Sequence, residues 1–426
     1  MADKPTLLFL IPRFPYPPTK GEKIHAWHYF LHLAKTHKIL LGCLIDEEVD
    51  PAHVDHVRQF CAELVYFPIK RATQKIKALV QFRPGRPLML DYNWHPGLAA
   101  WAQTKLGSRA VDVIYLFSTV MAPYVLPFIA IPFMAHANRP IILLDMVDVD
   151  SEKWREYSLT ARWPMRAIWA REARTLLAYE RMAAMAADLV FLVSQPECTR
   201  FRALVPEVGT KLHSLENGVD LEFFAPAHDL VNPYASPGPH LALVGHMDYW
   251  PNIDAAIWFA TEILPKLQKR YPTLEFAVIG ANPVPEVQNL RRLPGVTVTG
   301  RVTDVRPYVA HAAAAVIPLR IARGIQNKVL EAMALGRPVV VTPQAFEGVR
   351  ATAGHDLLVA DGADALVAKI GEVLDGKHPD IGRAARGAME AGYSWASRME
   401  LLDRLLDTEL AARRAKLPTV TSKDVA

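Results

Sequence analysis

The segment from 320 to 338 holds the residues best suited to bind an anion. A short apolar run ends at Pro318, Gly324 follows, and helical spacing begins near Gln326. The first N–H groups of a helix lack partners within it, and the helix dipole favours negative charge there. Lys328 stands in the first helical turn, where a cation is unfavourable for the helix itself. We therefore predict a bound anion at this helix start.

A carboxylate follows this lysine within about one turn of the same predicted helix. Glu331 stands three residues after Lys328, and residues at this spacing are neighbours on a helix. A carboxylate accepts hydrogen bonds, as the two hydroxyls of a ribose would require. The alternative is a surface helix on which Lys328 and Glu331 form a solvated pair. Our hypothesis is that the lysine binds phosphate groups and the glutamate binds a ribose.

The elements that position this segment follow a repeated strand–helix pattern. Short apolar runs with the length of buried parallel strands alternate with stretches of helical spacing. The runs in the first half are 6–11, 39–45, 111–117, 140–144 and 189–193, and those in the second half are 241–244, 275–279, 296–299, 313–317 and 339–342. Helical spacing is clear at 24–35, 255–270 and 327–335. This pattern predicts an α/β protein with two Rossmann-like, doubly wound domains.

Turn residues and a stretch rich in Pro, Gly, Asn and Ser separate the two series. We expect a first domain at 1–218 and a second at 219–392. Residues 393–414 predict an amphipathic helix that crosses back to the first domain, and 415–426 predict a frayed polar tail. Ligands of open α/β sheets bind outside the carboxyl ends of the strands. The expected ligand site is therefore a central cleft that the two domains face.

Glycines occur at several of these expected ligand-facing loops. Gly245, Gly280 and Gly300 follow predicted strands of the second domain, and Gly21 follows the first strand of the chain at a short distance. Each of them is also compatible with a simple turn. Their recurrence at strand ends favours close approach of a ligand to the backbone.

Composition and charge exclude several classes of protein. The chain has 426 residues, 51% of them hydrophobic and 22% charged, with a formal net charge of +4. This small charge gives no case for nucleic acid. The three cysteines are far apart in sequence, which predicts neither a disulfide framework nor a closed zinc site. No apolar run is long enough to span a bilayer and no export signal is evident, so we expect a cytoplasmic protein.

Several runs together resemble the GT-B glycosyltransferases, specifically the retaining, family 4-like enzymes. The runs are 15–24, 216–220, 243–252, 298–302, 328–336 (KVLEAMALG) and 393–395. A closer similarity is to the sugar transferases associated with exosortase and PEP-CTERM exopolysaccharide systems. It is carried by 145–154 (DMVDVDSEKW) and 324–328 (GIQNK).

The resemblance implies a hexosyl transfer from a UDP- or GDP-linked sugar with retention, without a metal or another cofactor. It places Gly21 and Gly245 at the donor phosphates, Arg301 and Val302 at the base, Lys328 at the diphosphate and Glu331 at the ribose. The full set of implied donor-binding residues is Gly21, Gly245, Arg301, Val302, Arg323, Gly324, Gln326, Asn327, Lys328 and Glu331. Arg323 replaces the first glutamate of the family's two-glutamate motif, so the contacts to the transferred sugar differ from the family pattern.

The candidate catalytic residues are Lys328, Glu331, Asp145 and His25, and the residues identify no catalytic base. Asp145 and Asp148 follow a predicted strand of the first domain and are candidates for contacts to an acceptor. The alternative is that they are loop or helix-cap aspartates. His25 follows the Gly21 loop, and a histidine on a helix is often structural.

Two basic stretches suggest an anionic membrane surface. Lys70–Arg86 and Trp154–Arg181 are rich in Lys and Arg, and the second interleaves them with tryptophan. A polyprenyl-diphosphate-linked saccharide acceptor would explain such a docking face, on the inner side of the cytoplasmic membrane. The alternative is a solvated helical face. Nucleic acid could use the same residues, but no nucleic-acid motif accompanies them, so we expect none to bind.

Three other functions remain open from the residues. A nucleotide-sugar epimerase of the same fold would interconvert its donor without an acceptor. A non-catalytic, membrane-docked binding protein would neither transfer nor hydrolyse the donor. An NAD-dependent oxidoreductase ranks last, because Pro12-Arg-Phe-Pro follows the first strand in place of GxGxxG.

Overall fold

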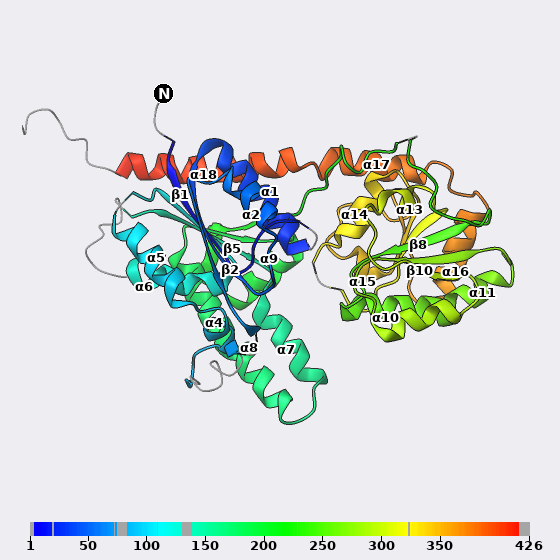
Figure 1. Cartoon of the computed structure of the whole chain (residues 1–426), viewed down its shortest axis with the longest axis horizontal. Coiled ribbons are helices and arrows are strands. Elements are labelled where there is room, and N and C mark those ends of the chain that lie inside the picture. Colours follow the sequence, from blue (N-terminus) through cyan, green and yellow to red (C-terminus); the bar gives the residue numbers. More distant parts are fainter. Residues whose placement is uncertain are drawn as a thin grey trace, which may run out of the picture. The chain divides into compact units, whose positions relative to one another are not determined.

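The computed structural model describes residues 4–18, 21–71, 73–74, 83–108, 110–129, 139–227, 229–322 and 324–416. The chain forms two compact units. The N-terminal unit comprises Met1–Glu216 and Met399–Ala426, and the C-terminal unit comprises Asn217–Arg398. Each unit is a parallel sheet with helices, and Figure 1 shows both. The C-terminal helix α18 (Trp395–Lys416) begins in the second unit and continues into the first along the chain.

The N-terminal unit has a seven-stranded sheet in the order β3-β2-β1-β4-β5-β6-β7. Its strands are β1 (Thr6–Ile11), β2 (Lys38–Ile45), β3 (Glu63–Pro68), β4 (Val113–Phe117), β5 (Ile141–Val147), β6 (Leu189–Leu192) and β7 (Leu212–Ser214). The helices are α1 (Gly21–Thr36), α2 (Pro51–Arg58), α4 (Leu88–Tyr92), α5 (Pro96–Gly107), α6 (Leu126–Ile129), α7 (Asp150–Thr160), α8 (Met165–Ala186) and α9 (Gln195–Leu204), with the 3₁₀ turns η1 (Thr119–Tyr124) and η2 (Pro206–Lys211). All strand pairs are parallel.

The C-terminal unit has a six-stranded parallel sheet in the order β10-β9-β8-β11-β12-β13. Its strands are β8 (His240–Val244), β9 (Glu275–Ile279), β10 (Val296–Val298), β11 (Ala314–Ile317), β12 (Val339–Val341) and β13 (Leu358–Val359). The helices are α10 (Trp250–Trp258), α11 (Leu264–Gln268), α12 (Pro285–Gln288), α13 (Arg306–Ala310), α14 (Asn327–Ala334), α15 (Pro343–Phe346), α16 (Ala363–Leu374) and α17 (Ile381–Gly392), with the π turn η3 (Phe259–Ile263) and the 3₁₀ turn η4 (Asn289–Arg292).

Both sheets reverse their strand order at one point. The chain starts at β1 or β8 in the middle, moves out to one edge, and returns to build the other half. This is the doubly wound topology in which the switch point, beside β1 and β4 or beside β8 and β11, leaves a crevice for ligands at the carboxyl ends. The prediction of two Rossmann-like, doubly wound α/β domains is confirmed.

The interiors of both units are apolar, as strands covered on both faces require. In the first unit Phe9 stacks on Tyr115, with ring centroids 4.7 Å apart, and both side chains are fully buried. In the second unit the rings of Phe259 and Phe276 lie 4.4 Å apart inside the larger hydrophobic cluster. These cores keep the strand ends, and therefore the loops that follow them, in place.

The sequence did not predict the strands β3, β7 and β13, and the helix predicted at 255–270 is divided. β7 and β13 are very short, and β3 is an edge strand with half-exposed and exposed side chains, so none of them is a clear apolar run. The helix predicted at 255–270 begins earlier, at Trp250, and changes to a π turn before α11. Pro265 explains the change, because proline has no N–H to donate to the preceding helical turn. No helix in the described part of the chain is long and apolar enough to cross a membrane.

Candidate functional site

The loops after β8, β9 and β10 are joined to one another at the carboxyl edge of the C-terminal sheet. Gly245 N–H donates to the carbonyl of Ile279 at 3.0 Å, and Gly280 N–H donates to the carbonyl of Gly300 at 3.2 Å. A Cβ atom at Gly280 would lie 1.7 Å from the Gly245 carbonyl oxygen, and φ at Gly280 is +151°. Only glycine fits where two backbones meet this closely, so these glycines shape the edge of the site.

Asn252 connects this glycine edge to the start of α14. Its side chain is 4% exposed, and its Nδ2 donates to the carbonyl oxygen of His246 at 2.9 Å. Its Oδ1 accepts a hydrogen bond from the Lys328 ammonium. The sequence contained Asn252 within the run 243–252 but offered no reason to single it out, because its role depends on a contact with a residue far along the chain.

Lys328 and Glu331 lie half-buried on α14. Burial lowers the pKa of Lys328 to about 8, and the charge of Glu331 opposes this change. Burial also raises the pKa of Glu331 to about 7, against the effect of the Lys328 charge. Within the described residues, Lys328 forms no ion pair, and in particular not the surface pair with Glu331 that was the alternative to a ligand site. A buried cation of this kind is stabilised by an anion that arrives with a ligand.

The backbone before α14 is shaped to leave the helix start open. Gly324 has φ of +63°, a conformation that favours glycine. Gln326 is the N-cap residue, and its side chain bonds back to the Gly324 carbonyl at 3.1 Å instead of capping the helix. Asn327 accepts a hydrogen bond at Oδ1 from Asn217 Nδ2 at 2.9 Å. The predicted donor residues Gly324, Gln326, Asn327 and Lys328 therefore surround one uncapped helix start.

Arg320 and the remaining predicted donor residues of the C-terminal unit differ in their surroundings. Arg320 forms an ion pair with Asp254, with its Nε 2.9 Å from a carboxylate oxygen, and its guanidinium lies 5.1 Å from the centroid of the Trp258 ring. A contact of Arg320 with a phosphate would require it to leave Asp254. Arg323 lies outside the described residues. Arg301 is exposed and Val302 is half-buried on the loop that follows β10, beside the glycine edge.

In the N-terminal unit, His25 and Asp145 form a buried pair with a third residue. His25 Nε2 lies 2.8 Å from Asp145 Oδ2, and the Tyr115 hydroxyl donates to the same oxygen at 2.6 Å. All three side chains are buried. Burial, followed by the neighbouring Asp145 charge, holds the pKa of Tyr115 well above its usual range. Sequence reasoning missed Tyr115, because within an apolar strand it is a typical core residue.

The backbone around Asp145 is built to hold its carboxylate. Asp145 Oδ1 accepts a hydrogen bond from Val147 N–H at 3.2 Å, and the pairing of β5 with β6 shifts register between these two residues. Val147 has φ of +67° and Ser118 has φ of +71°, and the Ser118 N–H donates to the Asp145 carbonyl at 2.6 Å. Such strained backbone is retained where the surroundings require it. With both oxygens occupied, Asp145 is suited to orient His25.

The remaining predicted residues of this unit lie nearer the surface. Gly21 is exposed at the start of α1. Asp148 lies 3.9 Å from the Lys153 ammonium, and Asp150 lies 3.0 Å from it. The charge of Asp150 is the main cause that raises the pKa of Lys153. Asp148 and Asp150 are thus acidic partners of a lysine at the start of α7.

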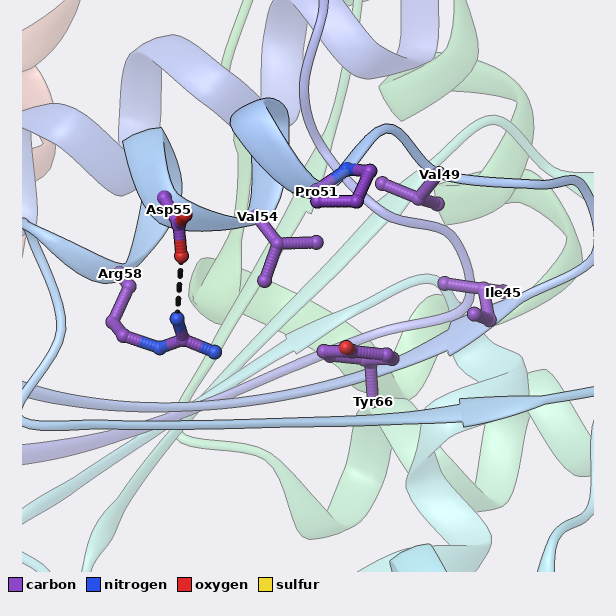
Figure 2. A pocket seen from close by; sticks show the side chains of 7 residues that line it. All are labelled: Ile45, Val49, Pro51, Val54, Asp55, Arg58 and Tyr66. Atoms are coloured by element: carbon purple, nitrogen blue, oxygen red, sulfur yellow. Dashed lines mark hydrogen bonds and ion pairs between the residues drawn. The ribbon is translucent and has the colours of Figure 1, made fainter.

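Two further features are a small hollow in the N-terminal unit and the arrangement of side chains that could bind a metal. The N-terminal unit has a hollow of about 220 Å³. Figure 2 shows the side chains that line it, which are Ile45, Val49, Pro51, Val54, Asp55, Arg58 and Tyr66. It is smaller than typical ligand pockets, which start at about 300 Å³, and it includes none of the predicted site residues. Among the described residues, no group of three or more His, Cys, Asp or Glu side chains is placed to hold a metal ion.

Comparison with known proteins gives one family match and several structural matches. Residues 238–376 match the family model described as glycosyl transferases group 1. This stretch contains the glycine edge, Asn252 and all of α14. No curated protein matches the chain.

Solved structures match over nearly the whole chain. Sucrose-phosphate synthase from Thermosynechococcus elongatus has a TM-score of 0.71 at 16% identity, covering 96% of this chain and 100% of its own. Anabaena HepE in complex with UDP and glucose has a TM-score of 0.65 at 15% identity, with 95% and 99% coverage. A glycosyltransferase from Rickettsia africae has a TM-score of 0.61 at 14% identity, with 95% and 98% coverage. These similarities establish the GT-B fold, and the glycosyl transferases group 1 domain at residues 238–376 within it supports a glycosyltransferase of the GT-B type.

Proposed function

We propose that the chain is a retaining hexosyltransferase that takes a sugar from a UDP- or GDP-linked donor. The observation that carries this proposal is the half-buried Lys328, which has no carboxylate in ion-pair distance within the described residues and stands at an uncapped helix start. The group 1 domain match contains this site. The structural neighbour HepE is described in complex with UDP and glucose, which makes UDP the first nucleotide to test.

Lys328 and the α14 helix start would hold the diphosphate, and Glu331 would accept hydrogen bonds from the ribose. During transfer, the bond between the anomeric carbon and a diphosphate oxygen breaks. A bond from the same carbon to an acceptor hydroxyl oxygen forms, and the hydroxyl proton passes to the departing diphosphate. The negative charge that develops on the diphosphate is stabilised by the Lys328 ammonium and by backbone N–H groups. In this proposal the protein supplies the positive charge itself and needs no metal or other cofactor.

The ionisation of both groups suits these roles. A lysine with a pKa of about 8 is about nine-tenths protonated at pH 7 before ligand binds, and a bound diphosphate favours the charged form further. The donor-side candidates Gly21, Gly245, Arg301, Val302, Gln326 and Asn327 would contribute mainly through their backbone and shape. Arg323, which lies outside the described residues, stays a proposed donor contact.

On the acceptor side, we propose that Asp145 acts through His25. Asp145 receives hydrogen bonds or contacts from Tyr115, Val147 and His25, so it would fix the orientation of the imidazole ring. The proposed acceptor is a saccharide linked to polyprenyl diphosphate, in exopolysaccharide biosynthesis of the PEP-CTERM type. The protein would act as a peripheral protein at the inner face of the cytoplasmic membrane.

One experiment separates this function from its alternatives. The full chain is screened by thermal shift against UDP, GDP, ADP and their sugars, because a bound ligand raises apparent stability by mass action. The stabilising donor is then incubated with and without a lipid-linked acceptor. Transfer only with acceptor supports the proposal. Interconversion of the donor sugar without acceptor would indicate an epimerase, and binding without any turnover would indicate a binding protein.

A further inference from the structure

The hairpin formed by α7 and α8 carries an exposed apolar tip. It leaves the carboxyl end of β5 and projects away from the sheet of its unit (Figure 1). All residues from 162 to 168 are exposed. Trp163 is 83% exposed and Leu159 is 65% exposed, and Met165 and Ile168 are also exposed. Large apolar side chains gathered at one apex are unusual for a surface that meets only water.

The tip stands on a well-anchored support. Just below it, the ring of Trp169 on α8 lies 5.7 Å from Tyr157 and 6.4 Å from Trp154, both on α7. Further down, the buried Glu172 carboxylate accepts hydrogen bonds from the N–H groups of Leu88 and Met89, each at 2.9 Å. The two helices are thus held to each other and to the body of the unit, and the apolar apex is presented in one place.

At the base of the hairpin the two helices are joined by a buried hydrogen bond. The Ser151 hydroxyl donates to Glu180 Oε2 at 2.5 Å, and the Ser151 N–H donates to Oε1 of the same carboxylate at 3.0 Å. Burial raises the pKa of Glu180 to about 8. This carboxyl group therefore belongs to the support of the hairpin and not to its tip.

The cations of the hairpin divide into two groups. Arg171 donates to the carbonyl oxygens of Arg83 and Arg86, at 2.7 and 2.9 Å, and Arg181 pairs with Glu207. Arg171 is half-buried, whereas Arg181 is exposed and its charge is paired. Arg162 and Arg166 are exposed at the tip and form no ion pair among the described residues. From 157 to 171 the chain contains no acidic residue, so the tip combines apolar surface with uncompensated positive charge.

We propose that this tip, residues 159–168, inserts into the interfacial region of a bilayer that contains anionic lipid. Trp and Arg are the residue types that occupy the headgroup region, and exposed arginines attract anionic lipids. From Glu172 to Met165, α8 rises by about 10 Å at about 1.5 Å per residue, which matches the depth of about 5–10 Å reached by interfacial helices. A convex apex of ten residues is too small for a stable protein interface, which takes about 20–30 residues a side.

The inference narrows the expected membrane contact from the basic stretch Trp154–Arg181 to the tip at residues 159–168, and it deepens the proposed function. Membrane binding by the tip does not depend on the proposed function, but the consequence for a lipid-linked acceptor rests on it. Because α7 follows directly on β5, a docked tip would hold the carboxyl edge of the N-terminal sheet, with His25 and Asp145, towards the bilayer side of that unit. A lipid-linked acceptor would then reach this edge from the membrane surface.

The test is co-sedimentation of the full chain with vesicles of phosphatidylcholine, alone or with about 30% phosphatidylglycerol. Wild type should bind the anionic vesicles, and about 0.5 M salt should weaken binding by screening. Arg162→Gln with Arg166→Gln should weaken it about 30-fold, at about fivefold per arginine. Trp163→Gln with Ile168→Gln should weaken binding by tenfold or more, by removing inserted apolar surface. All of these side chains are exposed, so the variants should keep the unfolding midpoint of wild type.

Matched controls lie in the C-terminal unit. Arg292 is exposed, and Val231 is 81% exposed, so Arg292→Gln and Val231→Gln should leave vesicle binding unchanged. UDP titrations keep the two proposals apart, because tip variants should bind UDP as wild type does, and Lys328→Met should still bind vesicles. Equal binding of wild type and tip variants would overturn the inference. So would equal binding to neutral vesicles, or a dimer in solution that only the tip variants lose.

Discussion

Replacement of Lys328 by methionine tests the electrostatics of the site most directly. Methionine keeps most of the side-chain volume but removes the ammonium group. A hydrogen bond to a charged group contributes about 1.5–3 kcal/mol, so loss of the Lys328 contact to a diphosphate should weaken UDP or GDP binding by about 10-fold to 150-fold. A matched control is Lys266→Met, because Lys266 pairs with Asp364 at 2.6 Å on the surface.

The same substitution should change how the stability of the free protein depends on pH. Burial lowers the pKa of Lys328 from 10.5 to about 8, so the folded state disfavours the charged form. Below pH 8 the lysine is protonated in both the folded and the unfolded protein. A lowering of its pKa from 10.5 to about 8 then corresponds to a penalty of about 3 kcal/mol on the folded state, at about 1.36 kcal/mol per pKa unit. Wild-type stability from this group should therefore rise between about pH 8 and 10.5. Lys328→Met should lack that rise. Its gain at pH 7 should be smaller than this penalty, because the buried Asn252 Oδ1 loses its donor at a cost of about 1–3 kcal/mol.

Two assays on the same samples decide the matter. Urea denaturation at several pH values reports the free energy of unfolding, and calorimetric titration reports nucleotide affinity. For wild type, affinity should fall as pH rises through about 8, because the free protein then loses the proton that the complex needs. A variant with wild-type affinity, or one whose stability still rises between about pH 8 and 10.5 as that of wild type does, would refute the assignment of a half-buried phosphate-binding cation.

Three further predictions concern other parts of the structure. Gly280→Ala should cost about 3 kcal/mol or more of unfolding free energy, because its Cβ would overlap the Gly245 carbonyl. Gly354→Ala is the control, since open space surrounds Gly354 and its φ is +83°; it should cost about 1 kcal/mol. Equal urea midpoints for the two variants would contradict the predicted overlap at Gly280. Tyr115→Phe should cost about 1–3 kcal/mol of unfolding free energy, because the buried Asp145 loses a donor. Tyr271→Phe loses only a hydrogen bond to Asp375 at the surface, so it should cost less than about 1 kcal/mol by the same measurement. Wild type should bind UDP more tightly than 2′-deoxy-UDP by calorimetry, most clearly above pH 7, because the raised pKa of Glu331, about 7, leaves its carboxylate charged there. Glu331→Gln should bind the two nucleotides with similar affinity. An unchanged preference for UDP in the variant would remove the ribose assignment.

The central strands of both sheets could be predicted from local sequence patterns, and most of the edge strands could not. β1 and β4 are continuous apolar runs because helices cover both faces of a parallel sheet. β3 lies at an edge, where half-exposed and exposed side chains break the apolar run. β13 has two residues, too few for any periodicity. The division of the helix at Pro265 was visible as a proline, but the π turn that accommodates it depends on the packing of Phe259 into the core.

The candidate site shows the same division. Lys328 and Glu331 could be identified from sequence because Gly324, the helix start and both charged residues lie within one short segment. Asn252 and Tyr115 could not, since each acts on a residue brought close by folding. Tyr115 lies 30 positions from Asp145 in sequence, and only the parallel pairing of β4 with β5 brings its hydroxyl to that carboxylate.

The sequence by itself determined the α/β architecture and the two series of strands, and it led to the prediction of an anion site before α14, because periodicity, glycine placement and helix polarity are local properties. The tertiary structure decided which groups are buried and what they contact. It placed the half-buried Lys328 beside Asn252, it occupied both oxygens of Asp145, and it separated the inward-pointing Arg171 from the exposed Arg162 and Arg166. Desolvation and hydrogen bonding depend on every atom that surrounds a group, and folding alone assembles those surroundings.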